Sequence, residues 1–155
     1  MTLRKIIAGG QTGADRAALD VAIKLGIPHG GWIPKGRLAE EGALPDKHHL
    51  SEMPTASYPK RTEKNVIDSD GTVIFTYGRL TGGSALTRKM AIKYNRCWLH
   101  VDLTKHTSFQ AAQTINKWIR QNNIEVLNLA GSRASKKPAI YDAITHILEK
   151  VANKR

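Results

Sequence analysis

The hydrophobic positions along the chain change their spacing repeatedly, and each change marks a switch between a predicted strand and a predicted helix. The run at 72–76 is almost continuously β-branched or aromatic, which is typical of a strand buried on both faces. Residues 108–121 instead place apolar side chains on one face at helical spacing. The same criteria predict further strands at 6–8, 27–33, 96–101 and 125–130, and further helices at 14–25, 61–70, 84–94 and 139–151.

Strands that alternate with helices form a parallel sheet covered by helices, and 155 residues fit one such domain. We therefore expect an α/β fold in a single domain over residues 1–155. Its sheet should be mainly parallel and five-stranded, with helices on both faces. At the boundaries, Gly26 is expected to end the first helix, Thr62 to cap the helix at 61–70, and Gly71 to end it.

Residues 34–60 follow neither period and hold several prolines and glycines. A connection of this length is unusual in a compact domain and indicates either a functional loop or a freely variable insertion. Because Lys35, Arg37, Glu40 and Glu41 lie on it next to turn glycines, we expect a lid over the first strand–helix junction.

Glycine-rich segments follow three of the predicted strands, at 9–13, 78–84 and 131–138. A strand–helix junction leaves backbone N–H groups without intrahelical partners, and glycine lets a ligand approach them closely. Such junctions are typical of phosphate sites, although a connection that binds nothing remains the alternative. In a parallel sheet the three junctions lie on one edge, where they can share a crevice.

Neither of two common nucleotide motifs fits the first junction. No Lys-Ser or Lys-Thr follows the last glycine, so the segment is not a Walker A loop. Gly9, Gly10 and Gly13 do not form the dinucleotide fingerprint, and the acidic residue expected about 20 positions later is missing. A more general phosphate site remains.

The formal net charge of +11 favours anionic partners. The basic residues are dispersed, and no nucleic-acid-binding motif appears, so a nucleic-acid-binding module is a weaker alternative. No apolar run is long enough for a membrane span, and the first residues do not resemble a signal peptide, so a cytoplasmic location without membrane attachment is expected. The single cysteine, Cys97, is expected to be a buried strand residue.

Six segments together resemble the putative molybdenum carrier family, a circularly permuted, Rossmann-like branch of the SLOG group, which also contains LOG-type nucleotide phosphoribohydrolases. They cover nearly the whole chain. The segments are Gly9-Gly10-Gln11-Thr12-Gly13-Ala14-Asp15, residues 30–37, Arg61-Thr62-Glu63-Lys64-Asn65-Val66, residues 68–72, Gly82-Gly83-Ser84-Ala85-Leu86-Thr87 and residues 128–133.

The resemblance implies a Rossmann-like three-layer fold, a tendency to form homo-oligomers, and a pocket for molybdenum cofactor (molybdopterin) or another nucleotide-derived ligand. A carrier of that kind would have a cofactor-donating or cofactor-accepting enzyme as a partner. The residues expected to bind the small phosphate-bearing ligand are Gly9, Gly10, Gln11, Thr12, Gly13, Asp15, Arg16, Lys35, Arg37, Gly82, Gly83, Ser84, Thr87, Gly131, Ser132 and Arg133.

The sequence favours a binding protein over an enzyme. In the related phosphoribohydrolases a catalytic glutamate follows the second glycine turn, but no Glu or Asp occurs between Asp70 and Asp102. A nucleotide-processing enzyme is therefore the alternative, with Glu40 or Glu41 as the acid–base group beside Arg37. No metal site is predicted, because Asp68 and Asp70 are two carboxylates in a turn, and the loop histidines 48 and 49 are expected to be solvated.

Overall fold

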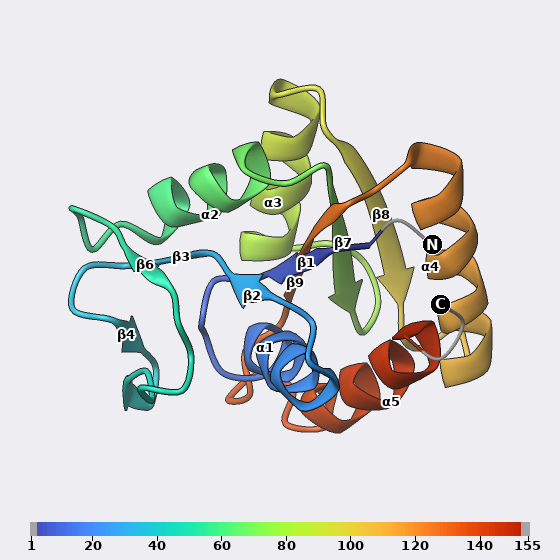
Figure 1. Ribbon diagram of the computed structural model, residues 1–155, viewed down its shortest axis with the longest axis horizontal. Coiled ribbons are helices and arrows are strands. Elements are labelled where there is room, and N and C mark those ends of the chain that lie inside the picture. Colours follow the sequence, from blue (N-terminus) through green and yellow to red (C-terminus); the bar gives the residue numbers. More distant parts are fainter. Residues whose placement is uncertain (1–2, 153–155) are drawn as a thin grey trace.

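The computed structural model describes residues 3–152 and is built on a central parallel sheet (Figure 1). Its strands are β1 (Lys5–Ile7), β2 (His29–Gly30), β7 (Gly71–Thr76), β8 (Cys97–Asp102) and β9 (Val126–Gly131). They lie in the order β2-β1-β9-β7-β8, and every neighbouring pair is parallel. All six residues of β7 are buried, as its apolar sequence predicts. The predicted five-stranded parallel sheet is confirmed.

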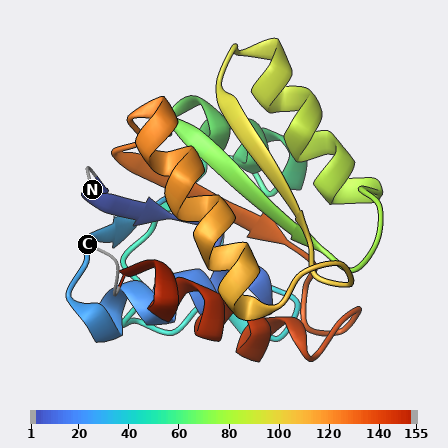
Figure 2. The same cartoon turned by 90° about the vertical axis from the view of Figure 1, so that its right-hand side faces the viewer.

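Helices cover both faces of this sheet (Figures 1 and 2). On one face lie α1 (Ala14–Leu25), α4 (Ser108–Asn122) and α5 (Ile140–Ala152). On the other lie α2 (Tyr58–Ile67) and α3 (Gly82–Lys93). Alanines of α1 are fully buried, and their small side chains let that helix pack closely. None of the helices within residues 3–152 is long and apolar enough to cross a membrane.

The second helix begins and ends earlier than predicted. Ser57, not Thr62, is its N-cap, and the Ser57 hydroxyl accepts a hydrogen bond from the Lys60 amide at 3.3 Å. Pro59 lies in the first turn, where proline needs no intrahelical donor, so it starts a helix here instead of marking a loop. Gly71 does not end the helix, because it is already the first residue of β7.

Residues 34–60 are more regular than the predicted loop. The predicted strand 27–33 divides at Gly31 into β2 and β3 (Trp32–Ile33), and β3 pairs with β6 (Ser51–Glu52) in a separate two-stranded sheet. A hairpin of β4 (Leu38–Ala39) and β5 (Gly42–Ala43) lies between them. Gly31, where the two strands divide, has φ +123°, and a Cβ added there would sit 2.3 Å from the Ala8 carbonyl oxygen. This position therefore requires glycine.

Two expectations about single side chains are wrong for reasons of position. Cys97 is only half-buried, because β8 is an edge strand of the sheet. His48 is 1% exposed, and its Nε2 lies 2.6 Å from the Asp20 carboxylate, which also accepts a hydrogen bond from Tyr141. His48 itself is therefore packed against α1 through Asp20, whereas the neighbouring His49 is exposed, as expected.

The strand order identifies the place where a ligand crevice is expected. A circular count along the chain numbers β7, β8, β9, β1 and β2 as strands 1 to 5. Read from the β8 edge, the spatial order of the sheet is then 2-1-3-4-5, a doubly wound arrangement. In such sheets the crevice opens at the carboxyl ends of the strands where the connections diverge to opposite faces. Here that point lies between β7 and β9, because β7 leads into α3 and β9 leads toward α5 (Figure 1).

Candidate functional site

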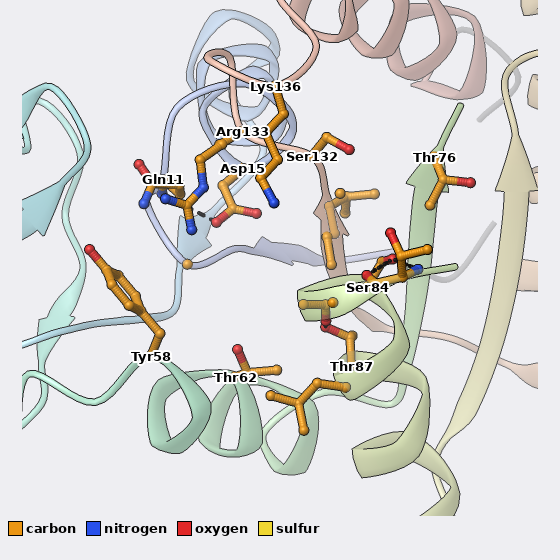
Figure 3. Close-up of a pocket in the computed structure, with 18 of the residues that line it drawn as sticks. Gln11, Asp15, Tyr58, Thr62, Thr76, Ser84, Thr87, Ser132, Arg133 and Lys136 are labelled. Atoms are coloured by element: carbon orange, nitrogen blue, oxygen red, sulfur yellow. Dashed lines mark hydrogen bonds between the residues drawn. The ribbon is translucent and has the colours of Figure 1, made fainter. Parts of the chain in front are cut away.

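A cavity of about 470 Å³ opens at this edge of the sheet (Figure 3). Arg133, Lys136, Ser132 and Asp15 lie along one side of it, and Tyr58 and Thr62 of α2 lie opposite. The first turn of α3 forms a further wall. All three glycine junctions contribute backbone to the lining, through Gly9, Gly82, Gly83 and Gly131.

Cationic side chains dominate the charge of the cavity wall. The described lining residues include one carboxylate, that of Asp15, and five cations: Arg61, Arg79, Arg133, Lys136 and Lys137. Within residues 3–152, the last four make no ion pair with a carboxylate. The Arg133 guanidinium lies 6.0 Å from the ring centre of Tyr58, and the Lys137 ammonium 5.8 Å from that of Tyr77. These cations are held by aromatic rings that leave their charge available to an anion.

Arg61 lies beneath this wall and depends on Gly9. Its Nη1 donates to the Gly9 carbonyl at 2.7 Å and lies 3.5 Å from Oδ2 of Asp15. A Cβ at Gly9 would sit 1.7 Å from that nitrogen, so only glycine leaves room for the guanidinium. Arg61 Nε is buried and has no hydrogen-bond partner among the described residues. Burial raises the pKa of Asp15 above its ordinary 3.8, although Arg61, the Gln11 amide and Arg16 oppose the shift.

The amides available to an anion belong to the second junction. The N–H groups of Gly82 and Gly83, at the start of α3, have no acceptor within the part of the chain that the structure describes. A Cβ at either position would meet nothing within 4 Å, so both face open space. The α3 N-terminus therefore presents two free amides in open space, an arrangement that is typical of anion sites at helix ends.

The carboxyl end of β8 holds the turn that precedes α3. His100 Nε2 lies 2.6 Å from the Thr76 hydroxyl, and Asp102 Oδ1 accepts from the Gly78 amide at 2.9 Å. Hydrogen bonds from the Thr104 hydroxyl, the Gly78 amide and the Thr104 amide lower the pKa of Asp102 to about 2. The second junction thus has a support that the local sequence does not reveal.

Several amides of the first junction are bonded within the protein itself. The Gln11 amide donates to Asp15 at 3.2 Å, the Thr12 amide to the Gln11 side chain at 3.0 Å, and the Ala14 amide to the Ser132 carbonyl at 3.1 Å. Three donors of the predicted phosphate cradle at the start of α1, the amides of Gln11, Thr12 and Ala14, therefore already have protein acceptors.

Gly13 does not line the cavity. A Cβ there would lie 2.5 Å from the Ser132 carbonyl oxygen and 2.8 Å from the Ala134 amide nitrogen, so Gly13 lets the first and third junctions pack together. Gly10 is likewise a packing position, against Ile33 and Leu50.

The predicted ligand residues of the hairpin region also lie off the cavity wall. Lys35 is exposed, and the Arg37 guanidinium binds backbone carbonyls of its own loop, including that of His48 at 2.8 Å. Arg16 pairs with Glu41, and Glu40 bonds to Thr12 and Ser135. Of the predicted residues, the structure therefore brings Gly9, Gln11, Asp15, Gly82, Gly83, Ser84, Thr87, Gly131, Ser132 and Arg133 to one cavity, and leaves out Gly10, Thr12, Gly13, Arg16, Lys35, Arg37, Glu40 and Glu41.

Sequence reasoning assigned no ligand role to the contributions of α2 to this wall. Tyr58, Arg61, Thr62 and Asn65 line the cavity. In the sequence, Arg61, Thr62 and Asn65 form an ordinary polar helix face, and Tyr58 falls in the predicted irregular segment. Only their place in one of the six resembling segments could have drawn attention to Arg61, Thr62 and Asn65.

The two turn carboxylates expected near residue 70 support the backbone. Asp70 accepts from the amides of Glu125 and Val126, and Asp68 accepts from the Trp32 indole at 2.7 Å. Residues 3–152 contain no group of three or more His, Cys, Asp or Glu side chains placed to hold a metal ion.

The chain is similar to a described family and to a solved structure. Residues 6–152 match the circularly permutated YpsA SLOG family. The chain is 57% identical to a protein from Syntrophus aciditrophicus SB named "Putative molybdenum carrier protein", with a TM-score of 0.95 over 97% of this chain and 95% of that one. No curated protein matches the chain. The shared fold confirms the Rossmann-like expectation.

Proposed function

The chain belongs to the circularly permutated YpsA SLOG family, and from this premise we propose that it is a binding or carrier protein for a phosphate-bearing, nucleotide-like ligand. We propose molybdenum cofactor as that ligand, because the similar protein from S. aciditrophicus is named as a molybdenum carrier. The observation that carries the proposal is the cavity wall, where four cations without a carboxylate partner and two amides without an acceptor, counted within residues 3–152, converge.

The described residues fit the phosphate end of such a cofactor. Arg133, Lys136 and the amides at the start of α3 would hold the phosphate, since charge-assisted hydrogen bonds to phosphate oxygens are among the strongest available to side chains. The buried Arg61 Nε, which has no partner among the described residues, offers a further donor below them. When bound, the cofactor would supply its own dithiolene sulfurs to the metal. Cys97 lies on β8, outside the cavity lining.

Native mass spectrometry of the purified protein, combined with elemental analysis for molybdenum, tests the proposal. We expect the wild type to carry a bound mass that the Arg133→Ala/Lys136→Ala variant loses. Calorimetric titration with ADP, a stable probe for the phosphate site, should show a loss of affinity of at least about a hundredfold in that variant, since each of two charged contacts contributes about 1.5–3 kcal/mol.

The matched control is Arg120→Ala/Lys89→Ala, which removes the same total charge. Both side chains are exposed, on α4 and α3, and make no ion pair within residues 3–152. This control should retain the ligand and the ADP affinity. A wild type that carries no phosphate-bearing mass and does not bind ADP would overturn the proposal, as would equal losses in the two double variants.

A further inference from the structure

The β4–β5 hairpin is joined to the loop after β9 by one side chain. Glu40, in the turn of the hairpin, accepts hydrogen bonds from the Ser135 amide at 3.0 Å, the Ser135 hydroxyl and the Thr12 hydroxyl. The Thr12 hydroxyl in turn accepts from the Ala134 amide at 3.1 Å. We name Glu40, Thr12 and Ser135 the Glu40 clasp. It ties together three segments that are far apart in sequence.

The clasp lies in the middle of the segment that supplies cations to the cavity. Ser135 stands between Arg133 and Lys136, and both line the cavity wall. The amides of Lys136 and Lys137 each donate to the Arg133 carbonyl at 3.1 Å, so the segment is one compact turn. A contact that holds Ser135 therefore also limits where the neighbouring cations can lie.

The same hairpin residue orients a second cavity side chain. The Glu40 amide donates to Gln11 Oε1 at 2.7 Å, and the Thr12 amide donates to the same oxygen at 3.0 Å. Because that oxygen is already taken, the side-chain amide nitrogen of Gln11 is the group left for a ligand. Gln11 lines the cavity and is 8% exposed.

We propose that Glu40 is a positioning residue: without touching the ligand, it holds the Arg133–Lys137 turn and the Gln11 side chain in the arrangement that meets an anion. This inference deepens the function proposed above and rests on it. It assigns the hairpin to ligand recognition, although none of the hairpin's residues lines the cavity.

The chemistry of the clasp requires a carboxylate. Burial acts to raise the pKa of Glu40, but the hydrogen bonds from Ser135 and Thr12 outweigh it and keep the pKa below the ordinary 4.5. The group therefore remains an acceptor-only anion at neutral pH. Its exposed position makes its effect on global stability small, so its main effect is on local order.

The neighbouring residue provides a matched control. Glu41 stands in the same hairpin turn and pairs with Arg16, whose guanidinium also donates to the Gly10 carbonyl at 3.2 Å. Neither Glu41 nor Arg16 touches the 132–137 segment through a hydrogen bond or ion pair that the structure describes. Glu41→Ala thus removes a hairpin carboxylate without removing the clasp.

The experiment compares Glu40→Ala, Glu40→Gln and Glu41→Ala in two measurements. Hydrogen exchange of the unliganded protein should be faster at residues 133–137 in Glu40→Ala and unchanged there in Glu41→Ala. The ADP affinity should fall about tenfold in Glu40→Ala, because the hydrogen bonds that order the 133–137 turn are lost. It should fall less than about twofold in Glu41→Ala, which keeps those bonds. Glu40→Gln should lie between, because glutamine keeps one acceptor oxygen for the Ser135 amide.

A double-mutant cycle separates positioning from general destabilisation. In an Arg133→Ala background, Glu40→Ala should weaken ADP binding much less than in the wild type, because a cation that it positions is gone. Full additivity would overturn the proposal. If Glu40→Ala does not fold, Ser135→Ala, which removes the hydroxyl half of the clasp, takes its place.

Failure of this inference and failure of the proposed function are distinguishable. A wild type that binds no phosphate ligand overturns both, and the exchange rates then show whether the clasp orders the turn at all. Unchanged exchange in Glu40→Ala, or unchanged ADP affinity, overturns the positioning role alone. Weaker ADP binding without faster exchange would also overturn it, because Glu40 would then act on the ligand directly.

Discussion

At the scale of single residues, the glycines of the first junction have separate functions that their sequence pattern hides. Gly9 leaves room for the Arg61 guanidinium, whereas Gly13 leaves room for the backbone of residues 132–134. A phosphate cradle would need free amides at this turn, but those of Gln11, Thr12 and Ala14 are already bonded within the protein. Gly13 is therefore a packing position between two junctions.

Gly13→Ala should lower the free energy of unfolding by about 3 kcal/mol or more, because it combines a glycine-only backbone conformation with a clash. Gly13 has φ +79° and ψ −122°, and its added Cβ would press on backbone atoms that cannot move independently. Urea unfolding followed by circular dichroism measures the loss.

Gly26→Ala is the matched control, since Gly26 has φ +71° with nothing within 4 Å of a Cβ. Gly26→Ala should lower the free energy of unfolding by only about 1 kcal/mol, because the left-handed backbone conformation is then the only source of strain. Equal losses in the two variants would contradict a packing role for Gly13.

At the scale of elements, the β7–α3 turn depends on the neighbouring strand β8. The turn carries Arg79 and leads into the open amides of Gly82 and Gly83. From the carboxyl end of β8, Asp102 accepts from the Gly78 amide of the turn, and His100 contacts Thr76, the last residue of β7 before it. Neither residue belongs to a glycine junction, so only strand adjacency connects them to the site.

Asp102→Asn should destabilise the protein at about pH 5, and the difference from wild type should shrink as the pH falls. The folded pKa of Asp102, about 2, lies below its ordinary 3.8, so its contribution is present above the ordinary value and is lost as the pH falls through about 2. Urea unfolding of both proteins between about pH 5 and pH 2.5 measures this trend.

Asp46→Asn serves as the control, because Asp46 is an exposed loop residue whose carboxylate accepts no hydrogen bond within residues 3–152. The difference in unfolding free energy between Asp46→Asn and wild type should not shrink in this way as the pH falls. A difference for Asp102→Asn that stays constant over the whole range would contradict the anchoring role.

How well each element could be predicted depended on whether its signals were local. Helix α1 has local signals, namely an apolar face and Gly26 as its C-cap. Its predicted bounds 14–25 are confirmed. Helix α2 has a polar sequence with a proline in its first turn, so its start at Tyr58 was missed by three residues. The short strands within 34–60 pair only with distant partners or across a tight turn, and no two-residue strand has a usable period.

At the scale of the whole molecule, the excess positive charge is only in part a general surface property. The net charge is +11, and four of the cations that lack a carboxylate partner within residues 3–152 gather at the switch point of the sheet. The diverging connections of β7 and β9 open the crevice, and the loops after these strands carry the cations to it. Charge and topology thus favour an anion at the same place.

ADP affinity should fall by about tenfold when NaCl is raised from about 50 to about 500 mM, because added salt screens the attraction between cations and phosphate. The dependence should be shallower in Arg133→Ala/Lys136→Ala, which lacks two of the attracting charges. Isothermal titration calorimetry at several salt concentrations measures both slopes. An affinity that does not change with salt would contradict an electrostatic site.

The sequence by itself determined the alternation of strands and helices, the parallel sheet and the three glycine junctions, because hydrophobic period and turn residues are local properties. It also determined the family, because six short segments together are specific. Only the tertiary structure decided which junction amides have acceptors: the Ala14 amide donates to the Ser132 carbonyl, far away in the sequence, whereas those of Gly82 and Gly83 have no acceptor within residues 3–152. The roles of Arg61 and Glu40 were likewise decided by contacts across 52 and 95 residues of sequence, which no local pattern records.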